Sequence, residues 1–288
     1  MSGLVSRNLK IFFRDKGAVI FSLLGVLIVA GLNILFLGDA YADSLKDFEG
    51  AKNIVSAWVM AGLLAITSVT TTMGAFGTMV QDKERKIFKD FYCAPISRNS
   101  ITLSYIISSA VVGLIMTGIV LIIALVYLTI NKAITLSALM IIQLIAVSIL
   151  TSLANTAMVL FLVSFVNSSK ANGALSGVIS ALIGFVTGIY LPVGNLPEGV
   201  QYVVKCFPTS HSAVLFRQIL MGDMEDSVVN FPPEAQAEAL AGVRETMGVV
   251  FKFGETECTS FASLMVVVGT LVIFSALSVI ILRNKKNG

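Results

Sequence analysis

The chain has 288 residues, of which 56% are hydrophobic and only 13% are charged, and its mean hydropathy is +0.89. Ordinary soluble domains carry roughly a quarter charged residues, so this composition excludes a soluble globular class and indicates a membrane protein with several spans. The net charge of +3 does not favour nucleic acid as a partner. The three cysteines and the one histidine show no metal-ligand spacing, so we expect no metal site.

Residues 1–17 have the pattern of an amphipathic helix. One side carries apolar residues and another carries basic ones, among them Phe12, Phe13 and Arg7. We expect this helix to lie along the cytoplasmic interface with Arg7 at the lipid headgroups, either as an anchor or as a moving part. The apolar run that follows has no small-residue cleavage site, so we interpret it as a retained first span.

Six apolar stretches reach the roughly 20 residues that a bilayer core requires, namely residues 18–37, 54–80, 101–130, 134–166, 173–191 and 261–282. Most Lys and Arg residues fall in the N-terminal, 83–98 and C-terminal segments, and most acids fall between the other spans. Because basic residues favour the cytoplasmic side, we expect both termini to be cytoplasmic. Every charged residue lies outside these six stretches, which argues against a carrier with its own ion relay.

Polar residues inside the spans are few, and they include Asn33, Thr71 and Asn155. Two interpretations stay open for them. They could form hydrogen bonds between packed helices, or they could line a path for a substrate.

Residues 81–98, QDKERKIFKDFYCAPISR, combine many charges with aromatic residues. We predict a cytoplasmic helix over 82–95 that Pro95 ends. Lys83, Glu84 and Arg85 form a dense charged turn. An apolar ridge follows, made by Ile87, Phe88 and Phe91. A helix exposed only to water would gain nothing from such a ridge. We therefore expect the ridge either to lie on the membrane surface or to dock into another protein.

Residues 192–260 lie between the fifth and sixth spans. Two short apolar helices, split at Pro208, begin near Pro197, and each is too short to cross a bilayer, so we expect them to enter the outer leaflet and return. Arg217 lies on the second of these helices and must snorkel, pair, or meet anionic lipid or substrate. An acidic cap follows.

Cys206 and Cys258 both fall on the outer side. A disulfide could persist there, so free thiols and a Cys206–Cys258 bridge both stay open.

Two passages carry a resemblance to a known family. One is QDKERKIFKDFYCAPISRNSI, with its Pro-x-Ser-Arg sequence at 95–98, and the other is YLPVGNLPEGVQYVVKCFPTSHSAVLFRQILMGD at 190–223. Together with the order of spans, they resemble the membrane subunits of ABC type-2 exporters, in the branch linked to drug and antimicrobial resistance. Many members of that family carry Gly-Thr where this chain has Lys86-Ile87.

The resemblance implies an all-α integral membrane protein with six transmembrane helices. It implies an interfacial helix at 1–17, spans one to five within 18–191 with a coupling helix at 82–95, re-entrant gate helices and a cap at 192–260, and the last span with a basic tail at 261–288. It also implies a partner dimer of ABC ATPase subunits that binds ATP and Mg, a second permease subunit, and a place in the bacterial plasma membrane.

The chain contains no phosphate-loop motif of the G-x-x-x-x-G-K-[ST] type, so we expect it to bind no cofactor itself and not to be an enzyme. The mostly apolar spans suit an amphiphilic or hydrophobic substrate such as an antibiotic or an antimicrobial peptide. Export of polysaccharide, lipid or sodium and a stand-alone secondary carrier are the alternatives.

Overall fold

The computed structural model describes residues 1–32, 36, 38–222, 224–254 and 256–284. Its helices are α1 (Ser2–Arg14), α2 (Lys16–Leu32), α3 (Gly38–Ser44), α4 (Ala51–Glu84), α5 (Phe88–Cys93), α6 (Arg98–Ile130), α7 (Ala138–Ser164), α8 (Ser169–Val186), α9 (Glu198–Cys206), α10 (Pro208–Leu220), α11 (Pro233–Thr246) and α12 (Ser260–Asn284). Two short 3₁₀ turns, η2 (Val193–Asn195) and η3 (Glu225–Val228), and two strands, β1 (Phe251–Phe253) and β2 (Thr256–Cys258), complete the described elements.

This architecture confirms the all-α membrane fold. Five helices, α4, α6, α7, α8 and α12, are long and apolar enough to cross a membrane. The first two helices would supply a sixth span if they are taken together, but they are bent by 70° at their junction. The bend separates the amphipathic α1 from the apolar α2, as expected where an interfacial helix joins a span.

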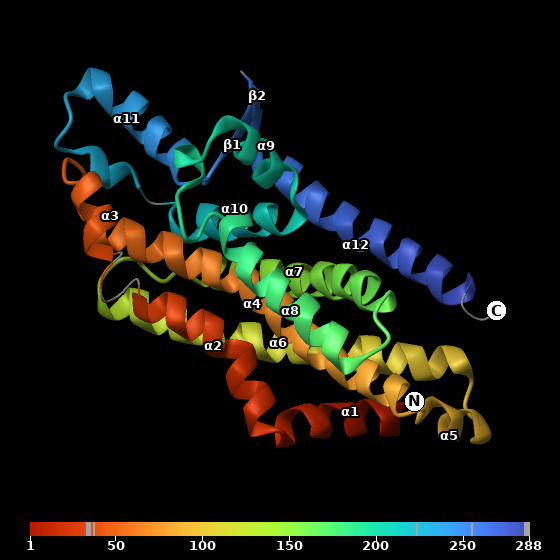
Figure 1. Cartoon of the computed structure of the whole chain (residues 1–288). Coiled ribbons are helices and arrows are strands. Elements are labelled where there is room, and N and C mark those ends of the chain that lie inside the picture. Colours follow the sequence, from red (N-terminus) through yellow and green to blue (C-terminus); the bar gives the residue numbers. More distant parts are fainter. Residues whose placement is uncertain (33–35, 37, 223, 255, 285–288) are drawn as a thin grey trace.

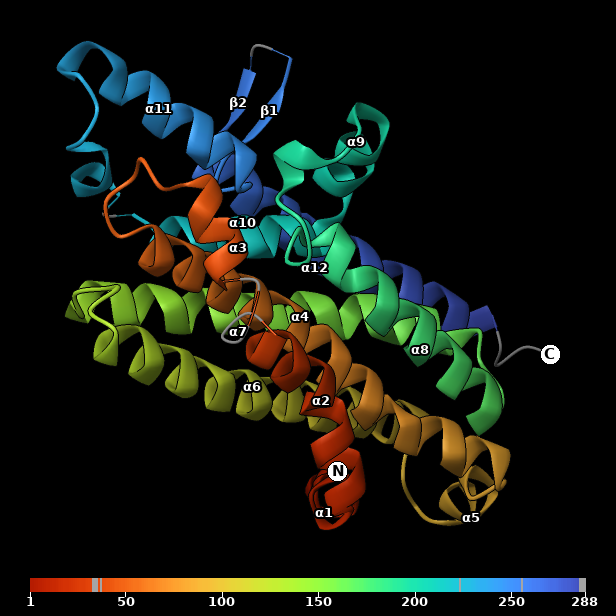
Figure 2. The same ribbon diagram turned by 60° about the vertical axis from the view of Figure 1, so that its left-hand side comes forward.

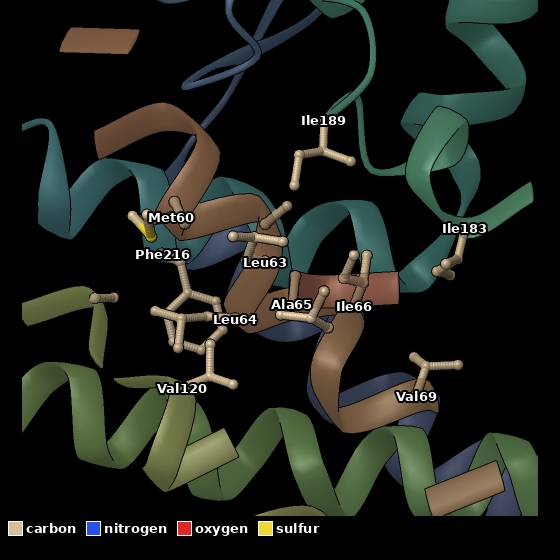
Figure 3. Packing of buried hydrophobic residues seen from close by; sticks show 14 of the residues in the cluster. Met60, Leu63, Leu64, Ala65, Ile66, Val69, Val120, Ile183, Ile189 and Phe216 are labelled. Carbon is tan, nitrogen blue, oxygen red and sulfur yellow. The ribbon is translucent and has the colours of Figure 1, made fainter. Parts of the chain in front are cut away.

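The long helix α4 forms the centre of the bundle. It contacts α2, α6, α7, α8 and α10, and 89% of its most apolar window is buried, against 17% for α8 and for α12. Figure 3 shows how its side chains Leu63, Leu64 and Ile66 lie among residues from the neighbouring helices, including Val120 of α6 and Phe216 of α10. The outer faces of α8 and α12 are apolar and unburied, which suits contact with lipid.

The two ends of the bundle differ. Helices α1 and α5 lie toward the same end as the last described turn of α12 (Figure 1), and we call this the α5 end. Helix α3, helix α9, helix α11 and the strand pair lie toward the other end (Figures 1 and 2), which we call the α11 end. The strands pair antiparallel, with Phe251 opposite Cys258.

The segment after α8 contains the two expected short helices, and Pro208 starts the second of them. Pro197 precedes the first helical residue of α9. Helix α10 packs against α4, α7 and α12, and nearly all of its residues are buried. It therefore belongs to the helix bundle, while η3, α11 and the strand pair form a cap at the α11 end.

The predicted fifth span, 173–191, is shifted in the structure. Helix α8 runs from Ser169 to Val186, because Gly188 adopts a left-handed φ of 67° and ends the helix. The fourth span also begins later than expected, since α7 starts at Ala138 and Ser137 caps it.

Candidate functional site

The charged segment at the α5 end is built differently from the predicted helix over 82–95. Helix α4 continues through the charged residues to Glu84, so Asp82 and Glu84 lie at the C-terminal end of one helix and not at the start of another. Lys86 then adopts a left-handed φ of 62°. The amide of Ile87 bonds to the carbonyl of Asp82 at 2.9 Å and the amide of Lys86 to that of Lys83 at 3.1 Å. This Schellman turn separates α4 from the short α5.

Asp82 is the buried charge of this region, with a relative exposure of 3%. The guanidinium of Arg7, from α1, donates two hydrogen bonds to its carboxylate, at 2.6 and 3.0 Å. The hydroxyl of Tyr105, from α6, donates a third at 2.6 Å. One carboxylate thus joins α1, α4 and α6. A bidentate pair of this kind contributes binding energy and also fixes the orientation of the two side chains. The hydrogen bond from Arg7 to Asp82 raises the pKa of Arg7 above its ordinary value.

The apolar ridge of α5 packs against this cluster. The ring of Phe88 stacks on Tyr105, with centroids 5.6 Å apart, and the guanidinium of Arg7 lies 5.4 Å from the ring centre of Phe91. Both phenylalanines are half-buried, as is Ile87. The ridge is therefore covered in part by Tyr105 and Arg7 of the same chain. This contact is a third location, beside the membrane surface and the partner protein that the sequence left open.

The outward face of α5 consists of other residues. Lys89, Asp90, Tyr92 and Cys93 are exposed, and the guanidinium of Arg98 lies 4.7 Å from the ring centre of Tyr92. This face is charged at one edge and aromatic at the other. It is the part of α5 that a partner could reach.

The charged turn is tied to the loop before α8. The ammonium of Lys83 donates to the side-chain oxygen of Asn167 at 2.6 Å, and the carboxylate of Glu84 accepts hydrogen bonds from Ser169, its amide among them. Arg85 stays exposed. The turn thus links the end of α4 to the start of α8.

The segment that leaves α5 is short. Ala94 ends the helix in an extended conformation, and Pro95 follows as an exposed residue. The hydroxyl of Ser97 accepts a hydrogen bond from the amide of Ser100, which caps α6. The helix stop expected at Pro95 is therefore confirmed, two residues after the last helical residue, Cys93.

Helix α1 does not turn all of its basic residues outward. Arg7 faces Asp82 and pairs with its carboxylate, and its position at the lipid headgroups stays a prediction. Lys10 and Arg14 remain exposed. Of the two aromatic residues, Phe12 is buried at 3% exposure, whereas Phe13 is exposed.

The polar residues of the spans form hydrogen bonds inside the bundle. The Thr71 hydroxyl donates to the carbonyl of Thr67 at 2.7 Å. The Asn155 amide donates to the hydroxyl of Ser68 at 2.6 Å and accepts from Thr209 at 3.3 Å. Thr71 and Asn155 are both buried. Asn155 joins α7 to α4 and α10, which supports the helix-packing interpretation for it, whereas the Thr71 bond stays within α4. Asn33 lies outside the described residues.

Arg217, at the α11 end, is fully buried. Its guanidinium donates to the carbonyls of Thr187 at 2.8 Å, Gly188 at 3.3 Å and Gly248 at 3.3 Å, and it lies 5.5 Å from the ring centre of Trp58. The sequence left snorkelling, pairing and contact with lipid or substrate open for Arg217. In the structure it pairs, and its partners are backbone carbonyls.

Cys206 and Cys258 are both free thiols in the structure. Within the described ranges, His, Cys, Asp and Glu residues form no group of three or more that could hold a metal ion.

Sequence reasoning did not identify Trp58, Asp82 or Tyr105 as members of these clusters. Asp82 offered a signal, because an acid placed two residues after an apolar span is either at the surface or paired. Its partners Arg7 and Tyr105 lie 75 and 23 residues away in the sequence, and nothing in the local pattern indicates such a pairing.

Comparison with known proteins gives one family. The search of curated proteins gave no match. Residues 33–282 match the family described as "ABC-2 family transporter protein". That range covers most of the chain and contains α4 to α11 and most of α12. The chain therefore belongs to the ABC-2 transporter family, as a multi-pass membrane protein and permease component of an ABC transporter.

Proposed function

We propose that this chain is the permease subunit of an ATP-driven exporter, and that the α5 end faces the cytoplasm and binds a dimer of separate ATPase subunits. The ATPase would bind ATP and Mg, and a second permease subunit, either a copy of this chain or a related one, would complete the transporter. Both termini would then be cytoplasmic, in the bacterial plasma membrane. The basic residues gathered at the α5 end support this orientation.

The construction of the α5 end carries the proposal. A short helix projects from the end of the central helix α4 and presents Lys89, Asp90 and Tyr92 outward. A charged and aromatic face of this kind suits a protein partner, because aromatic anchors supply affinity and charges supply orientation. The face differs from the ridge of Ile87, Phe88 and Phe91 that the sequence indicated.

The same construction supplies a route for movement. A force on α5 acts through Phe88 on Tyr105 of α6 and through Phe91 on Arg7 of α1. Both of those residues bind Asp82 at the end of α4. Since α4 contacts five other helices of the bundle, a displacement of α5 would reach most of the spans.

For the substrate, we propose an amphiphilic or hydrophobic compound such as an antibiotic or an antimicrobial peptide. The apolar surfaces of α8 and α12 and the lack of charged residues in the predicted spans suit a compound that enters from the membrane. Polysaccharide, lipid or sodium would be the alternatives to test alongside it.

The test is reconstitution with a candidate partner ATPase of the ABC class. The complex is purified in lipid nanodiscs, and ATPase binding and ATP hydrolysis are measured with and without amphiphilic compounds. We expect Tyr92→Ala to weaken ATPase binding at least tenfold, an order-of-magnitude estimate for an aromatic anchor. Tyr202→Ala is the matched control, since Tyr202 is a similarly exposed tyrosine on α9 at the opposite end.

Three outcomes separate the readings. Stable binding, with hydrolysis that responds to one compound class, would support the proposal and begin to identify the substrate. Equal binding by the Tyr92→Ala and wild-type proteins would remove the assigned docking face. If no ATPase associates, the secondary-carrier alternative would replace the exporter.

A further inference from the structure

Arg217 is a buried cation that forms no ion pair in the part of the chain that the structure describes. A charge taken out of water needs compensating partners, and these are normally carboxylates. Here three backbone carbonyls take that role, those of Thr187, Gly188 and Gly248. They belong to two segments that are 60 residues apart in the sequence, so Arg217 connects two separate parts of the fold.

Both segments are the C-terminal turns of helices. After α8, the amide of Ile189 bonds to the carbonyl of Gly184 at 2.9 Å, and after α11 the amide of Val249 bonds to that of Arg244 at 2.8 Å. Each turn is a Schellman motif with a glycine, Gly188 or Gly248, in the left-handed region. Helix C-termini carry partial negative charge, so two of them converge on one guanidinium.

The two glycines also leave room for buried side chains, Gly248 for the guanidinium and Gly188 for Val193. A Cβ atom added at Gly248 would lie 3.0 Å from Nη1 of Arg217, and one added at Gly188 would lie 2.5 Å from Cγ2 of Val193. The backbone thus approaches the buried side chains more closely than any other residue type would allow.

Two more side chains of the bundle hold the turn after α11. The indole nitrogen of Trp58, from α4, donates to the carbonyl of Met247 at 2.8 Å. The amide of Gln218, from α10, donates to the carbonyl of Val249 at 3.0 Å. Together with Arg217, they fasten the end of α11 to the two most buried helices of the bundle.

The cap has a second attachment at its other side. The ring of Phe48 lies 4.8 Å from that of Phe231, and the amide of Glu49 bonds to the carbonyl of Ser227 at 2.8 Å. This attachment involves backbone and aromatic contacts without a buried charge. It is the point about which the cap could pivot if the Arg217 contact were released.

We propose that Arg217 is the positioning residue that fastens the cap to the helix bundle, by holding the C-terminal turns of α8 and α11 together against α10. Arg217 has two carbonyl contacts on α8 and one, at 3.3 Å, on α11. Release would therefore break the Gly248 contact while Arg217 stays on α8, and it would also require the Trp58–Met247 and Gln218–Val249 hydrogen bonds to open. That this release accompanies opening of the transport path rests on the proposed function, whereas the fastening itself does not.

The experiment uses the single tryptophan of the chain as a reporter. Trp58 is fully buried and touches both Arg217 and the turn after α11. The full chain in nanodiscs, without ATPase, is compared with Arg217→Gln by tryptophan emission and by hydrogen exchange of the amides of residues 243–250. Arg98→Gln is the matched control, because Arg98 also lies over an aromatic ring but at the opposite end.

We expect Arg217→Gln to shift Trp58 emission to longer wavelength and to speed exchange at 243–250 by at least about tenfold, as loss of a hydrogen bond to a charged group would. Exchange in α6 and α7 and all readings of Arg98→Gln should stay as in the wild type. Should Arg217→Gln fail to fold, Gly248→Ala keeps the arginine but places a Cβ 3.0 Å from its Nη1 and 3.1 Å from Cγ2 of Val193. This crowding displaces the Arg217 contact at that turn, so it should give the same two changes.

Unchanged emission and exchange in whichever of the two variants folds would overturn the fastening role. A second stage adds the ATPase and a trapped ATP state to the wild-type protein. A shift of Trp58 emission in that state would support release during transport, and no shift would overturn release while leaving the fastening result in place. Failure of the ATPase to bind at all counts against the proposed function and not against the fastening.

Discussion

Among the residues that the structure describes, each end of the bundle buries one charged side chain, and the two are stabilised in different ways. At the α5 end, Asp82 is compensated by side chains, an ion pair with Arg7 and a hydrogen bond from Tyr105. At the α11 end, Arg217 is compensated by carbonyls of two helix ends and by the face of Trp58. Side-chain partners can be exchanged by mutation, whereas backbone partners cannot, so the two ends should respond differently to substitution.

The degree of burial differs as well. The side chain of Arg7 is 30% exposed, so water can replace part of what Asp82 provides. Arg217 is 0% exposed, so nothing can replace its carbonyl contacts without rearrangement. A pair that is open to water can exchange its partner for water, whereas a fully buried contact breaks only when the packing around it rearranges.

The largest expected effect is at Arg217. Arg217→Met keeps much of the side-chain volume but leaves the carbonyls of Thr187, Gly188 and Gly248 without their donors. We expect a loss of about 3–5 kcal/mol in the free energy of unfolding, because three buried carbonyls lose their donor at a cost of about 1–3 kcal/mol each. Thermal unfolding of the chain in nanodiscs measures it. If Arg217→Met lowers the free energy of unfolding by less than Asp82→Ala does, the idea that the α11 end depends more strongly on its buried charge is wrong.

The second-largest loss of stability is expected for Asp82→Ala. It removes the acceptor of Arg7 and of Tyr105, and we expect a loss of about 2–3 kcal/mol, less than for Arg217→Met because water reaches Arg7. The double variant Arg7→Ala/Asp82→Ala sharpens the test. If the pair is coupled, the double loss falls short of the sum of the two single losses, and additive losses would mean that the bidentate contact is not formed.

A smaller effect is expected at the glycine of the α8 turn. Gly188→Ala forces a Cβ into the left-handed region and against Val193, and we expect a loss of about 2 kcal/mol. Gly254→Ala is the matched control, since Gly254 has a similar φ of 64° but open space around the added atom. It should cost only about 1 kcal/mol. Equal losses would show that the room beside Val193 does not matter.

The smallest expected effect is a gain in stability, at Lys86. Lys86 occupies the left-handed position of the turn after α4, where Gly188 and Gly248 occupy the same position after α8 and α11. Lys86→Gly should raise the free energy of unfolding by about 0.5–1 kcal/mol, because glycine relieves the strain of that φ. Thermal unfolding checks it, with Lys89→Gly inside α5 as the control that should lower stability.

Much of the fold was predictable from local pattern. Membrane-length apolar stretches mark the spans, and Pro208 marks the start of α10, because hydrophobic periodicity and proline act on the chain locally. The boundaries at Glu84 and Val186 were not predictable to the same degree. A helix continues through charged residues as easily as through apolar ones until a turn residue stops it, and Lys86 gives no such signal in the sequence.

The site was predictable in position but not in orientation. The segment 81–98 was identified as charged and aromatic, but its first residues, 81–84, continue helix α4. Which of its faces is free depended on Arg7 and Tyr105, which cover Phe91 and Phe88. Residues so far apart in the sequence meet only through the packing of α1 and α6 on α4.

The sequence by itself determined the membrane class of this protein and the order of its apolar helices, because burial in lipid imposes length and hydropathy on each helix separately. The tertiary structure alone decided which charges are buried and what compensates them. In the sequence, Asp82 begins a run of charged residues and Arg217 stands alone among apolar ones, and neither pattern indicates a partner. Only the packing of distant helix ends provides one with a guanidinium and the other with the carbonyls of two helices.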